Sequence, residues 1–378
     1  MILHGDLPPV GHKIALRVTA ENKLASFLPE NQYWLDSGTS ALALALLDAK
    51  AKFPHLTRPR AIIPGYCCPD LVAACVYAGI EPVAIDIEKN DPAYDLEQLR
   101  ISLDETVVAI IAINFLGVAE RLLALRELIS GLGLQTCLIE DNAQWFPASR
   151  AEMNFSSDYV TFSFGRGKPL SLLGGGLLLS KSPLADAVLQ KVAKCAANSK
   201  LTRIKIVAYN WLLNPRFYML LNRNPFLRLG ETKYNPLEKI ELLDSFRFSL
   251  LTENFNLYSK RNGALPQRFN EITAWGLQRF GAVHSLRCRQ LLRYPLLCAD
   301  GTARDALLER MRRAGLGVTA MYKLPIDQIE GVGNLVSVPA PLINARSFAD
   351  RFMTLPVHSG VSSRFQKRIL SCLNRHDA

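Results

Sequence analysis

The alternation of short apolar runs with amphipathic ones between residues 59 and 180 constrains the fold of this chain most strongly. Apolar runs of strand length occur at 61–64, 82–86, 106–114, 134–141, 158–164 and 172–179. Helical patterns separate several of them, at Asp70–Ala78, which ends at Gly79, and at Glu120–Leu132. The run 106–114 is almost continuously apolar, as in a strand covered on both faces. This order predicts an α/β fold with a mostly parallel mixed sheet covered by helices.

The chain has 378 residues, of which 49% are hydrophobic, so it can form a large domain and a smaller one. We place the boundary near residue 250. This gives a large domain at 1–250 and a small C-terminal α+β domain at 251–378. Further helices are expected within 240–270, at Asp305–Gly315 and at Arg364–Leu373.

The formal net charge is +10, from 44 Lys and Arg against 34 Asp and Glu, which indicates an anionic partner. The basic residues are spread thinly and form no dense block with aromatics, so we expect a small anionic substrate rather than a nucleic acid. The eight cysteines contain no C-x-x-C pair and indicate buried thiols in a reducing compartment, with no metal site. We see no signal peptide and no transmembrane run, and we expect a cytoplasmic protein.

Three short segments are candidates for chemistry. The first is Ser37-Gly38-Thr39-Ser40, which leads directly into a helical run. The unpaired N–H groups at a helix start can bind a phosphate, although Ser and Thr are also ordinary N-cap residues. The second is Asp141, after the strand that ends at Ile139. A carboxylate at this end of a sheet can bind a ligand, or it can simply cap the next helix.

The third candidate is Lys168, which lies between Gly167 and Pro169 close to a strand end. The segment is not a phosphate-binding P-loop, because Phe162 and Pro169 occupy positions where that motif needs Gly and Ser or Thr. A lone lysine is usually a surface charge. In this order, however, an N–H cradle, an acid and an amine are the minimal set for pyridoxal phosphate (PLP), which needs a phosphate site, an acid at its ring nitrogen and an amine for its aldehyde.

Several motifs extend this set into a family resemblance. They are Ser37–Leu42, Ile63–Tyr66, Gly79–Asp86, Ile139–Gln144 (IEDNAQ), Ser163–Lys168 (SFGRGK) and Thr354–His358. Together they resemble the DegT/DnrJ/EryC1/StrS family of PLP-dependent sugar aminotransferases, within fold type I of the aspartate aminotransferases. The likeness covers most of the chain and is strongest over residues 35–180.

The resemblance implies a role for each matching residue. Lys168 would hold the cofactor as a Schiff base and shuttle protons, Asp141 would pair with the pyridine nitrogen, and Gln144 would lie beside the ring. The phosphate would be contacted by Gly38, Thr39, Ser40 and Ser163. In Lys233-Tyr234-Asn235, the asparagine would reach the phosphate of the partner subunit, which implies a homodimer with shared sites.

The implied reaction moves an amino group from glutamate or glutamine to a keto group of a nucleotide-linked sugar, in polysaccharide or lipopolysaccharide biosynthesis. Lys168 argues against the related sugar dehydratases, which replace this lysine. Two other interpretations stay open. One is a PLP enzyme acting on a non-sugar ketone, and the other is a degenerate fold-type-I protein that acts as a binding or scaffold partner.

Three features depart from the family pattern. Cys68 stands where the family stacks an aromatic ring on the cofactor, two residues after the position of Tyr66. Asn114-Phe115-Leu116-Gly117 replaces the H-x-x-G segment. The interval between Lys168 and Asn235 is longer than usual and contains an atypical amphipathic segment at 201–230.

Residues 201–230 predict two helices, broken at Asn214-Pro215 and again near Asn224-Pro225. The first helix would carry an apolar stripe of Ile204, Val207, Ala208, Trp211 and Leu212. Basic residues flank it, namely Arg203, Lys205, Arg216, Arg223 and Arg228. We expect the stripe to pack on the large domain or on the dimer partner, because apolar stripes are usually buried. The alternative is that it docks on an anionic membrane surface.

Overall fold

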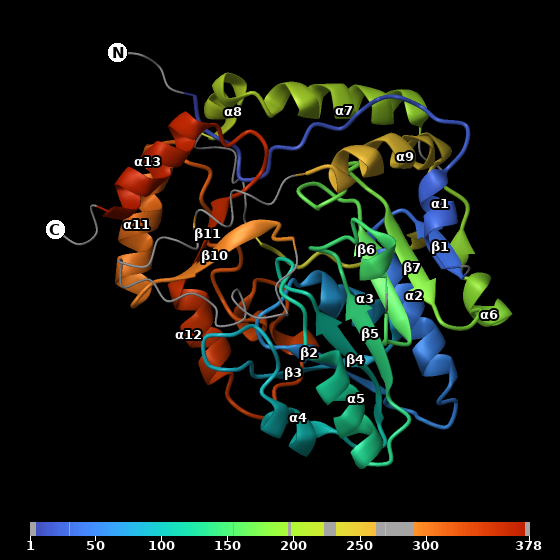
Figure 1. Ribbon diagram of the computed structural model, residues 1–378. Helices are drawn as coiled ribbons and strands as arrows, with labels where there is room; N and C mark the ends of the chain where they lie inside the picture. Colours follow the sequence, from blue (N-terminus) through green and yellow to red (C-terminus); the bar gives the residue numbers. More distant parts are fainter. Residues whose placement is uncertain are drawn as a thin grey trace.

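A seven-stranded sheet forms the centre of the molecule in the computed structural model (Figure 1). The structure describes residues 5–29, 31–153, 155–195, 198–222, 232–261, 269 and 290–374. The strand order is β1-β7-β6-β5-β4-β2-β3. The strands are β1 (Gln32–Leu35), β2 (Arg60–Pro64), β3 (Glu81–Ile85), β4 (Val107–Ile113), β5 (Cys137–Asp141), β6 (Tyr159–Ser163) and β7 (Gly176–Ser180).

The five strands β2 to β6 are parallel, and β7 runs antiparallel to both of its neighbours, β6 and β1. The mostly parallel α/β sheet expected from the sequence is therefore confirmed. β1 was not expected, because its four residues, QYWL, begin with a polar side chain and lie outside the alternating region 59–180. β7 begins later than the apolar run 172–179, because the backbone from Leu173 to Gly175 has positive φ angles that a strand cannot accommodate.

Helices cover both faces of the sheet. On one face, α2 (Gly38–Ala51) and α3 (Asp70–Ala78) pack together and belong to the main apolar core. On the other face, α4 (Leu96–Ser102) and α5 (Leu122–Gly131) enclose a second core. As the sequence predicted, α3 ends at Gly79, which adopts the left-handed conformation typical of a helix C-cap.

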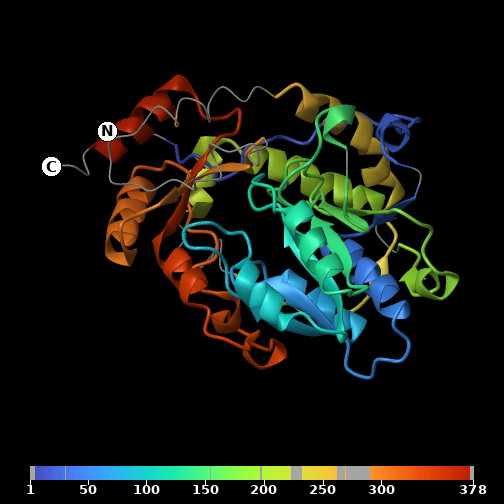
Figure 2. The same cartoon turned by 60° about the horizontal axis from the view of Figure 1, so that its bottom comes forward.

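A smaller group of elements lies beside the sheet, in orange and red in Figures 1 and 2. It contains the antiparallel strands β10 (Arg293–Leu297) and β11 (Phe352–Pro356), with α11 (Gly301–Arg313), α12 (Ile343–Arg351) and α13 (Ser363–Asn374). Asp86, after β3, accepts hydrogen bonds from the backbone N–H groups of Asn344 and Ala345 and so joins this group to the sheet. Residue 250 lies inside α9 (Ser245–Ser259), and the two-domain division of the sequence stays a prediction.

The atypical segment forms α7 (Ser199–Leu212) and α8 (Pro215–Asn222). The predicted break at Asn214-Pro215 is confirmed, whereas the one near Asn224-Pro225 lies outside the described residues, as do Arg223 and Arg228. The N-terminal segment runs alongside α7 in Figure 1. Asn210 fixes it there, since its side-chain amide exchanges two hydrogen bonds of 2.8 Å with the backbone of Ile14.

The remaining elements are short. They are α1 (Lys23–Phe27), α6 (Asp186–Leu189), the strands β8 (Val192–Ala193) and β9 (Ile240–Glu241), and three 3-10 turns at Arg150–Glu152, Ile326–Gln328 and Gly333–Leu335. Within the described part of the chain, no helix combines the length and apolarity needed to cross a bilayer.

The apolar stripe of α7 is not covered by its own chain. The helix buries Thr202 and Ile206, while Ile204 is 64% exposed and Trp211 is 67% exposed. The ring of Trp211 stacks on that of Phe217 in α8, with centroids 4.8 Å apart. The expectation that this stripe packs on the large domain is therefore wrong, because the buried face of α7 is set by Ile206 rather than by the stripe. Cover by a partner subunit stays a prediction.

Candidate active site

A cavity opens where the carboxyl ends of β4, β5 and β6 meet the N-terminus of α2. Six of the eight residues selected from the sequence line it, namely Gly38, Thr39, Asp141, Gln144, Ser163 and Lys168. In the sequence, these residues extend from Gly38 to Lys168. The topology brings them together, because consecutive parallel strands end at the same edge of the sheet.

The N-terminus of α2 provides a cradle for an anion. Ser37 caps the helix by accepting a hydrogen bond from the backbone N–H of Ser40. As the first residues of the helix, Gly38 and Thr39 have backbone N–H groups without a partner inside the helix. A Cβ atom at Gly38 would lie 2.6 Å from the Cβ of Ser163, so only glycine leaves the space between helix start and strand end open.

Asp141 is a buried carboxylate that is only partly satisfied. Its Oδ1 accepts a hydrogen bond of 2.8 Å from the backbone N–H of Ala143 and a weaker one from the Thr161 hydroxyl. Its Oδ2 has no hydrogen-bond donor in the described structure. Burial raises the pKa of Asp141, although the Ala143 N–H and the charge of Lys168 act in the opposite direction. A cation at Oδ2 would compensate the buried charge.

Lys168 presents an amine that no protein group engages. Its Nζ forms no hydrogen bond or ion pair within the described part of the chain. The backbone around it is fixed, because Gly167 has φ of 78° and the carbonyl of Pro169 accepts a 2.6 Å hydrogen bond from Arg261. The rigid loop therefore holds a free amine in the same cavity as Asp141.

Gln144 is buried and held on two sides. Its Oε1 accepts a 2.9 Å hydrogen bond from the backbone N–H of Leu116, and its Nε2 donates to the Tyr322 hydroxyl at 3.4 Å. Tyr66 lies behind the cavity and donates to the carbonyl of Tyr322. The loop before the small 3-10 turn at Ile326–Gln328 is thereby joined to the sheet.

Two aromatic residues that sequence reasoning did not select also line the cavity, Phe115 and Tyr322. Cys68 lines it as well, at the position where the family pattern has an aromatic ring. Burial and the neighbouring Asp70 raise the pKa of the Cys68 thiol to about 12, so the group is neutral at physiological pH. Among the described residues that line the cavity, Phe115 and Tyr322 carry the aromatic rings. No local sequence signal marked Tyr322, whose partners lie more than 170 residues away.

Asn114, the first residue of the segment that departs from H-x-x-G, does not line the cavity. Its amide is buried, donates to Glu140 at 2.7 Å and to Asn142, and its oxygen accepts from the N–H of Glu120. This network ties the loop after β4 to the loop after β5. The departure therefore affects the support of the site rather than its lining.

Ser40 and Asn235 also lie outside the lining. Ser40 is fully buried, and its hydroxyl is paired with that of Ser37. Asn235 is exposed and bonds only to the carbonyl of Lys233. The segment that contains Asn235 is attached to the rest of the chain by an ion pair between Lys233 and Glu330, at 3.3 Å. In its own chain, Asn235 is therefore free to contact another molecule.

The residues of the cavity fit PLP. The cradle of Gly38, Thr39 and Ser163 suits a phosphate, the open oxygen of Asp141 suits a protonated pyridine nitrogen, and the free amine of Lys168 suits an aldehyde. Each of these groups is left without a full set of protein partners. The cofactor would supply the missing ones.

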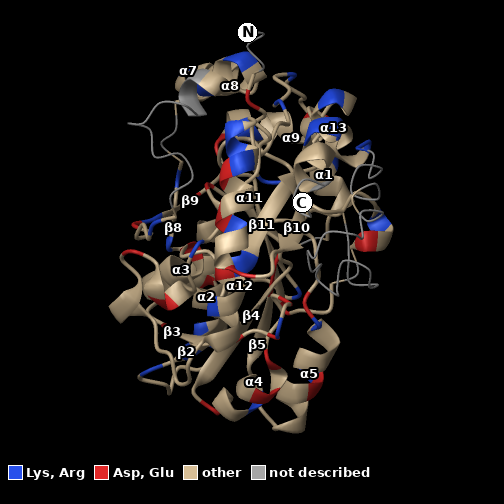
Figure 3. Ribbon diagram, turned by 90° about the vertical axis from the view of Figure 1, so that its left-hand side faces the viewer, with Lys and Arg blue, Asp and Glu red and all other residues tan. Residues whose placement is uncertain are grey.

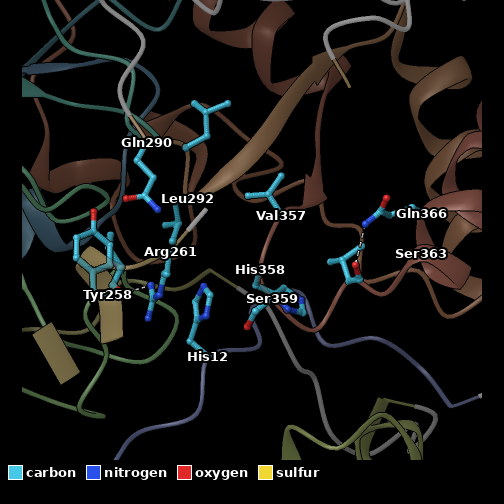
Figure 4. A pocket seen from close by; sticks show the side chains of 13 residues that line it. His12, Tyr258, Arg261, Gln290, Leu292, Val357, His358, Ser359, Ser363 and Gln366 are labelled. Carbon is cyan, nitrogen blue, oxygen red and sulfur yellow. Dashed lines mark hydrogen bonds between the residues drawn. The ribbon is translucent and has the colours of Figure 1, made fainter. Parts of the chain in front are cut away.

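A second cavity, of about 370 Å³, lies behind the lysine loop (Figure 4). Arg261 and His12 approach each other in it, with His358 and Ser359 beyond. Burial and the charge of Arg261 lower the pKa of His12 to about 3, and burial lowers that of His358 to about 4. His358 accepts at Nδ1 from the N–H of Gly360, so its Nε2 donates to the carbonyl of Pro8. The C-terminal Leu-Pro-x-His stretch thus anchors the N-terminal segment and not the cofactor.

The comparisons with known proteins agree with this geometry. The model of the DegT/DnrJ/EryC1/StrS aminotransferase family matches residues 19–214 and 254–374. A GDP-perosamine synthase from Vibrio cholerae is 26% identical over 195 residues, which are 50% of this chain and 52% of that protein. The match thus spans about half the length of this curated relative.

Solved structures share the fold. A DegT/DnrJ/EryC1/StrS aminotransferase from Brucella abortus has a TM-score of 0.69 and 18% identity, covering 95% of this chain and 91% of the other. A Streptococcus pneumoniae protein assigned as a sugar aminotransferase, in its PLP form, has a TM-score of 0.69 and 16% identity, covering 98% and 99%. The fold-type-I architecture expected from the sequence is confirmed.

The environment of Asp141 leads to a test. Asp141→Asn keeps an acceptor for the Ala143 N–H and removes the buried charge, so the cofactor-free variant should be at least as heat-stable as the wild type at pH 7–8. Because the pKa of Asp141 is raised, ionisation costs folding free energy above that pKa, and this cost disappears as the pH falls through it. The stability difference, measured by thermal melting, should therefore shrink on acidification.

Turnover of Asp141→Asn with bound cofactor should fall by orders of magnitude. Near-normal turnover would contradict the assignment.

Proposed function

The chain belongs to the DegT/DnrJ/EryC1/StrS aminotransferase family, whose members are PLP-dependent transferases, and we propose that it moves an amino group from an amino-acid donor to the keto group of a nucleotide-linked sugar. Membership confirms the family, the enzyme class and the cofactor expected from the sequence. The observation that carries the proposal is the meeting of an open N–H cradle, an unsatisfied carboxylate oxygen and a free amine in one cavity.

The residues of the chain divide the work. Bound PLP supplies an electron sink for the carbon next to the transferred nitrogen. Asp141 keeps the pyridine nitrogen protonated, which maintains that sink. The amine of Lys168 would remove the proton from the donor carbon that bears the nitrogen and would pass it to the carbon on the other side of that nitrogen. Phe115, Tyr322 and Gln144, which line the cavity, would lie beside the cofactor ring.

Two observations support a nucleotide-linked sugar as the acceptor. The curated relative is a GDP-perosamine synthase, and the net charge of +10 favours an anionic substrate. Glutamate or glutamine as the donor, and a place in polysaccharide or lipopolysaccharide synthesis, are part of the same proposal. A cytoplasmic location accords with the seven free cysteines among the described residues.

Borohydride reduction of the holoenzyme followed by peptide mapping should find the cofactor on Lys168 and on no other lysine. Lys168→Ala should lose the cofactor absorbance and all turnover, while Lys181→Ala, at an exposed lysine outside the cavity, should keep both. A panel of keto-sugar nucleotides should then yield an aminated product with glutamate or glutamine. If only non-sugar ketones are aminated, the acceptor is a ketone other than a sugar nucleotide. Absence of bound cofactor would favour a scaffold role.

We further propose that the active unit is a homodimer in which Asn235 of one chain completes the phosphate site of the other. The exposure of Asn235 and its distance from the lining of its own cavity support this arrangement.

Subunit mixing tests the shared site. Lys168→Ala and Asn235→Ala chains should each be poorly active alone, but their hybrid dimer should regain one intact site, because the chain with Lys168 receives Asn235 from its partner. Lys168→Ala mixed with Asp141→Asn should regain nothing, since both residues act in their own chain. No recovery in the first mixture, or full activity of a monomer at high dilution, would refute the shared site.

The exposed stripe of α7 is proposed to dock on an anionic membrane surface. Ile204, Val207 and Trp211 are exposed, the charged residues of α7 and α8 are Lys200, Arg203, Lys205 and Arg216, and no acidic residue occurs from 198 to 222. A basic amphipathic helix of this kind binds acidic lipids through apolar insertion and charge attraction.

Vesicle co-sedimentation should detect binding to acidic vesicles at low salt and its loss at high salt. Trp211→Glu should abolish binding, whereas Leu123→Glu, at a leucine of α5 that is 73% exposed, should not. Without binding by the wild type, the stripe would be assigned to the partner subunit instead.

A further inference from the structure

A pocket of about 350 Å³ lies between α7, α8, α11 and the N-terminal segment, on the side of the cofactor cavity where the chain departs most from its family. Arg166 and Gly167 line this pocket, and the next residue, Lys168, lines the cofactor cavity. Met321 lines the pocket, and Tyr322 lines the cavity. Two short segments thus form walls of both spaces, so a ligand in the pocket sits beside the reacting groups.

The pocket carries positive charge without a matching negative one. Arg166, Arg312 and Lys323 line it, and no carboxylate does. Within the described part of the chain, none of the three forms an ion pair. Arg313, the neighbour of Arg312 on α11, is different, since it pairs with Glu309 at 2.7 Å. Figure 3 shows α7 and α8 directly above α11 and its basic residues.

A fourth cation lies behind the wall. The guanidinium of Arg293 is buried, and its acceptors among the described residues are neutral, namely the Thr354 hydroxyl and the carbonyls of Pro9, Gly317 and Thr354. Burial lowers the pKa of Arg293 to about 9, so the group remains charged at neutral pH. Its charge and those of Arg166 and Arg312 act on the hydroxyl of Tyr218, as does the carboxylate of Asp6, which does not line the pocket.

Two tyrosines from the atypical segment complete the wall, Tyr209 of α7 and Tyr218 of α8. Both are half-buried, and burial raises the pKa of each. Each ring offers an apolar face next to the cations, a combination suited to a planar ring attached to phosphates. The size of the pocket is within the range of small-ligand sites.

We propose that this pocket binds the nucleoside diphosphate part of the amino-acceptor substrate, with Arg312 and Arg166 at the phosphates and Tyr218 against the base. This inference rests on the proposed function and adds the site of the substrate's anionic arm. It also gives the atypical segment a role, because α7 and α8 supply the two tyrosines that line the pocket.

Binding of nucleoside diphosphates (UDP, GDP, dTDP and CDP) and of pyrophosphate to the holoenzyme, measured by calorimetry, tests the site. Arg312→Gln should raise the dissociation constant of the preferred nucleoside diphosphate and of pyrophosphate about tenfold or more, because it removes a charge-assisted contact. Arg313→Gln should change both by less than about twofold, since Arg313 faces away and pairs with Glu309. Tyr218→Leu should weaken the nucleoside diphosphate and leave pyrophosphate unaffected. Thermal melting controls for folding.

Equal effects of Arg312→Gln and Arg313→Gln, or no binding of any nucleoside diphosphate, would overturn the inference. The donor half-reaction, followed by the cofactor absorbance with glutamate or glutamine alone, reports on the cofactor site separately and should be unchanged in Arg313→Gln. If the protein binds a nucleoside diphosphate through Arg312 but aminates no sugar nucleotide, the pocket assignment stands and the proposed function fails. If Arg312→Gln aminates a sugar nucleotide with an unchanged KM, the proposed function stands and the pocket assignment fails.

Discussion

The site depends on a close approach between two backbones, at the seam where α2 begins and β7 starts. The N–H of Gly175 donates to the carbonyl of Asp36 at 2.6 Å, and a Cβ atom at Gly176 would lie 2.1 Å from the carbonyl oxygen of Ser37. Only glycine fits there, and any side chain would push the helix start away from the sheet. Because Gly38 in turn packs against Ser163, the same seam sets the width of the anion cradle. The run Gly174-Gly175-Gly176 is therefore a condition for the phosphate site, and it also explains why β7 starts late.

Around this seam the fold holds charges that the protein alone does not neutralise. Counting the described residues, Asp141 has one oxygen without a donor, Lys168 has an amine without a hydrogen bond or ion pair, and the acceptors of Arg293 are neutral. Each arrangement costs folding free energy, because a buried charge without a counter-charge is poorly solvated. The rigid supports nearby, such as the Asn114–Glu140 network and the Arg261–Pro169 hydrogen bond, keep these groups from relaxing toward each other. A bound cofactor and substrate would recover this cost, which makes the unsatisfied groups good markers of the site.

The sequence predicted the part of the site that follows from local order. Asp141 and Ser163 directly end strands, Gly38 starts a helix, and Lys168 follows a strand closely, so a parallel sheet necessarily brings them to one edge. Tyr322 could not be found this way, because it reaches the cavity through tertiary contacts such as the 3.4 Å bond between Gln144 and Tyr322. Phe115 comes two residues after β4, so the same strand-end rule would have marked it. The stripe of α7 was recognised as apolar, but periodicity does not tell which side of a helix the rest of the chain covers. Ile206, which is fully buried, lies between stripe positions and decided that orientation.

The two faces of α7 have different surroundings, and one rigid helix connects them. Asn210 ties it to Ile14, and the N-terminal segment leads from there to Val10, which lines the pocket together with Gly167, the neighbour of Lys168. Tyr209 faces the cationic pocket, while Trp211 and Ile204 face solvent on the same rigid rod. Any surface that covers the outer face, whether lipid or a second chain, would therefore restrict the motion of the wall of the pocket and of the segment leading to the lysine loop. Ordering this wall before the substrate arrives would lower the entropy cost of binding, because less of the pocket has to be fixed on association. In this arrangement, a surface contact outside the cavity would favour the binding of the acceptor without touching any reacting group.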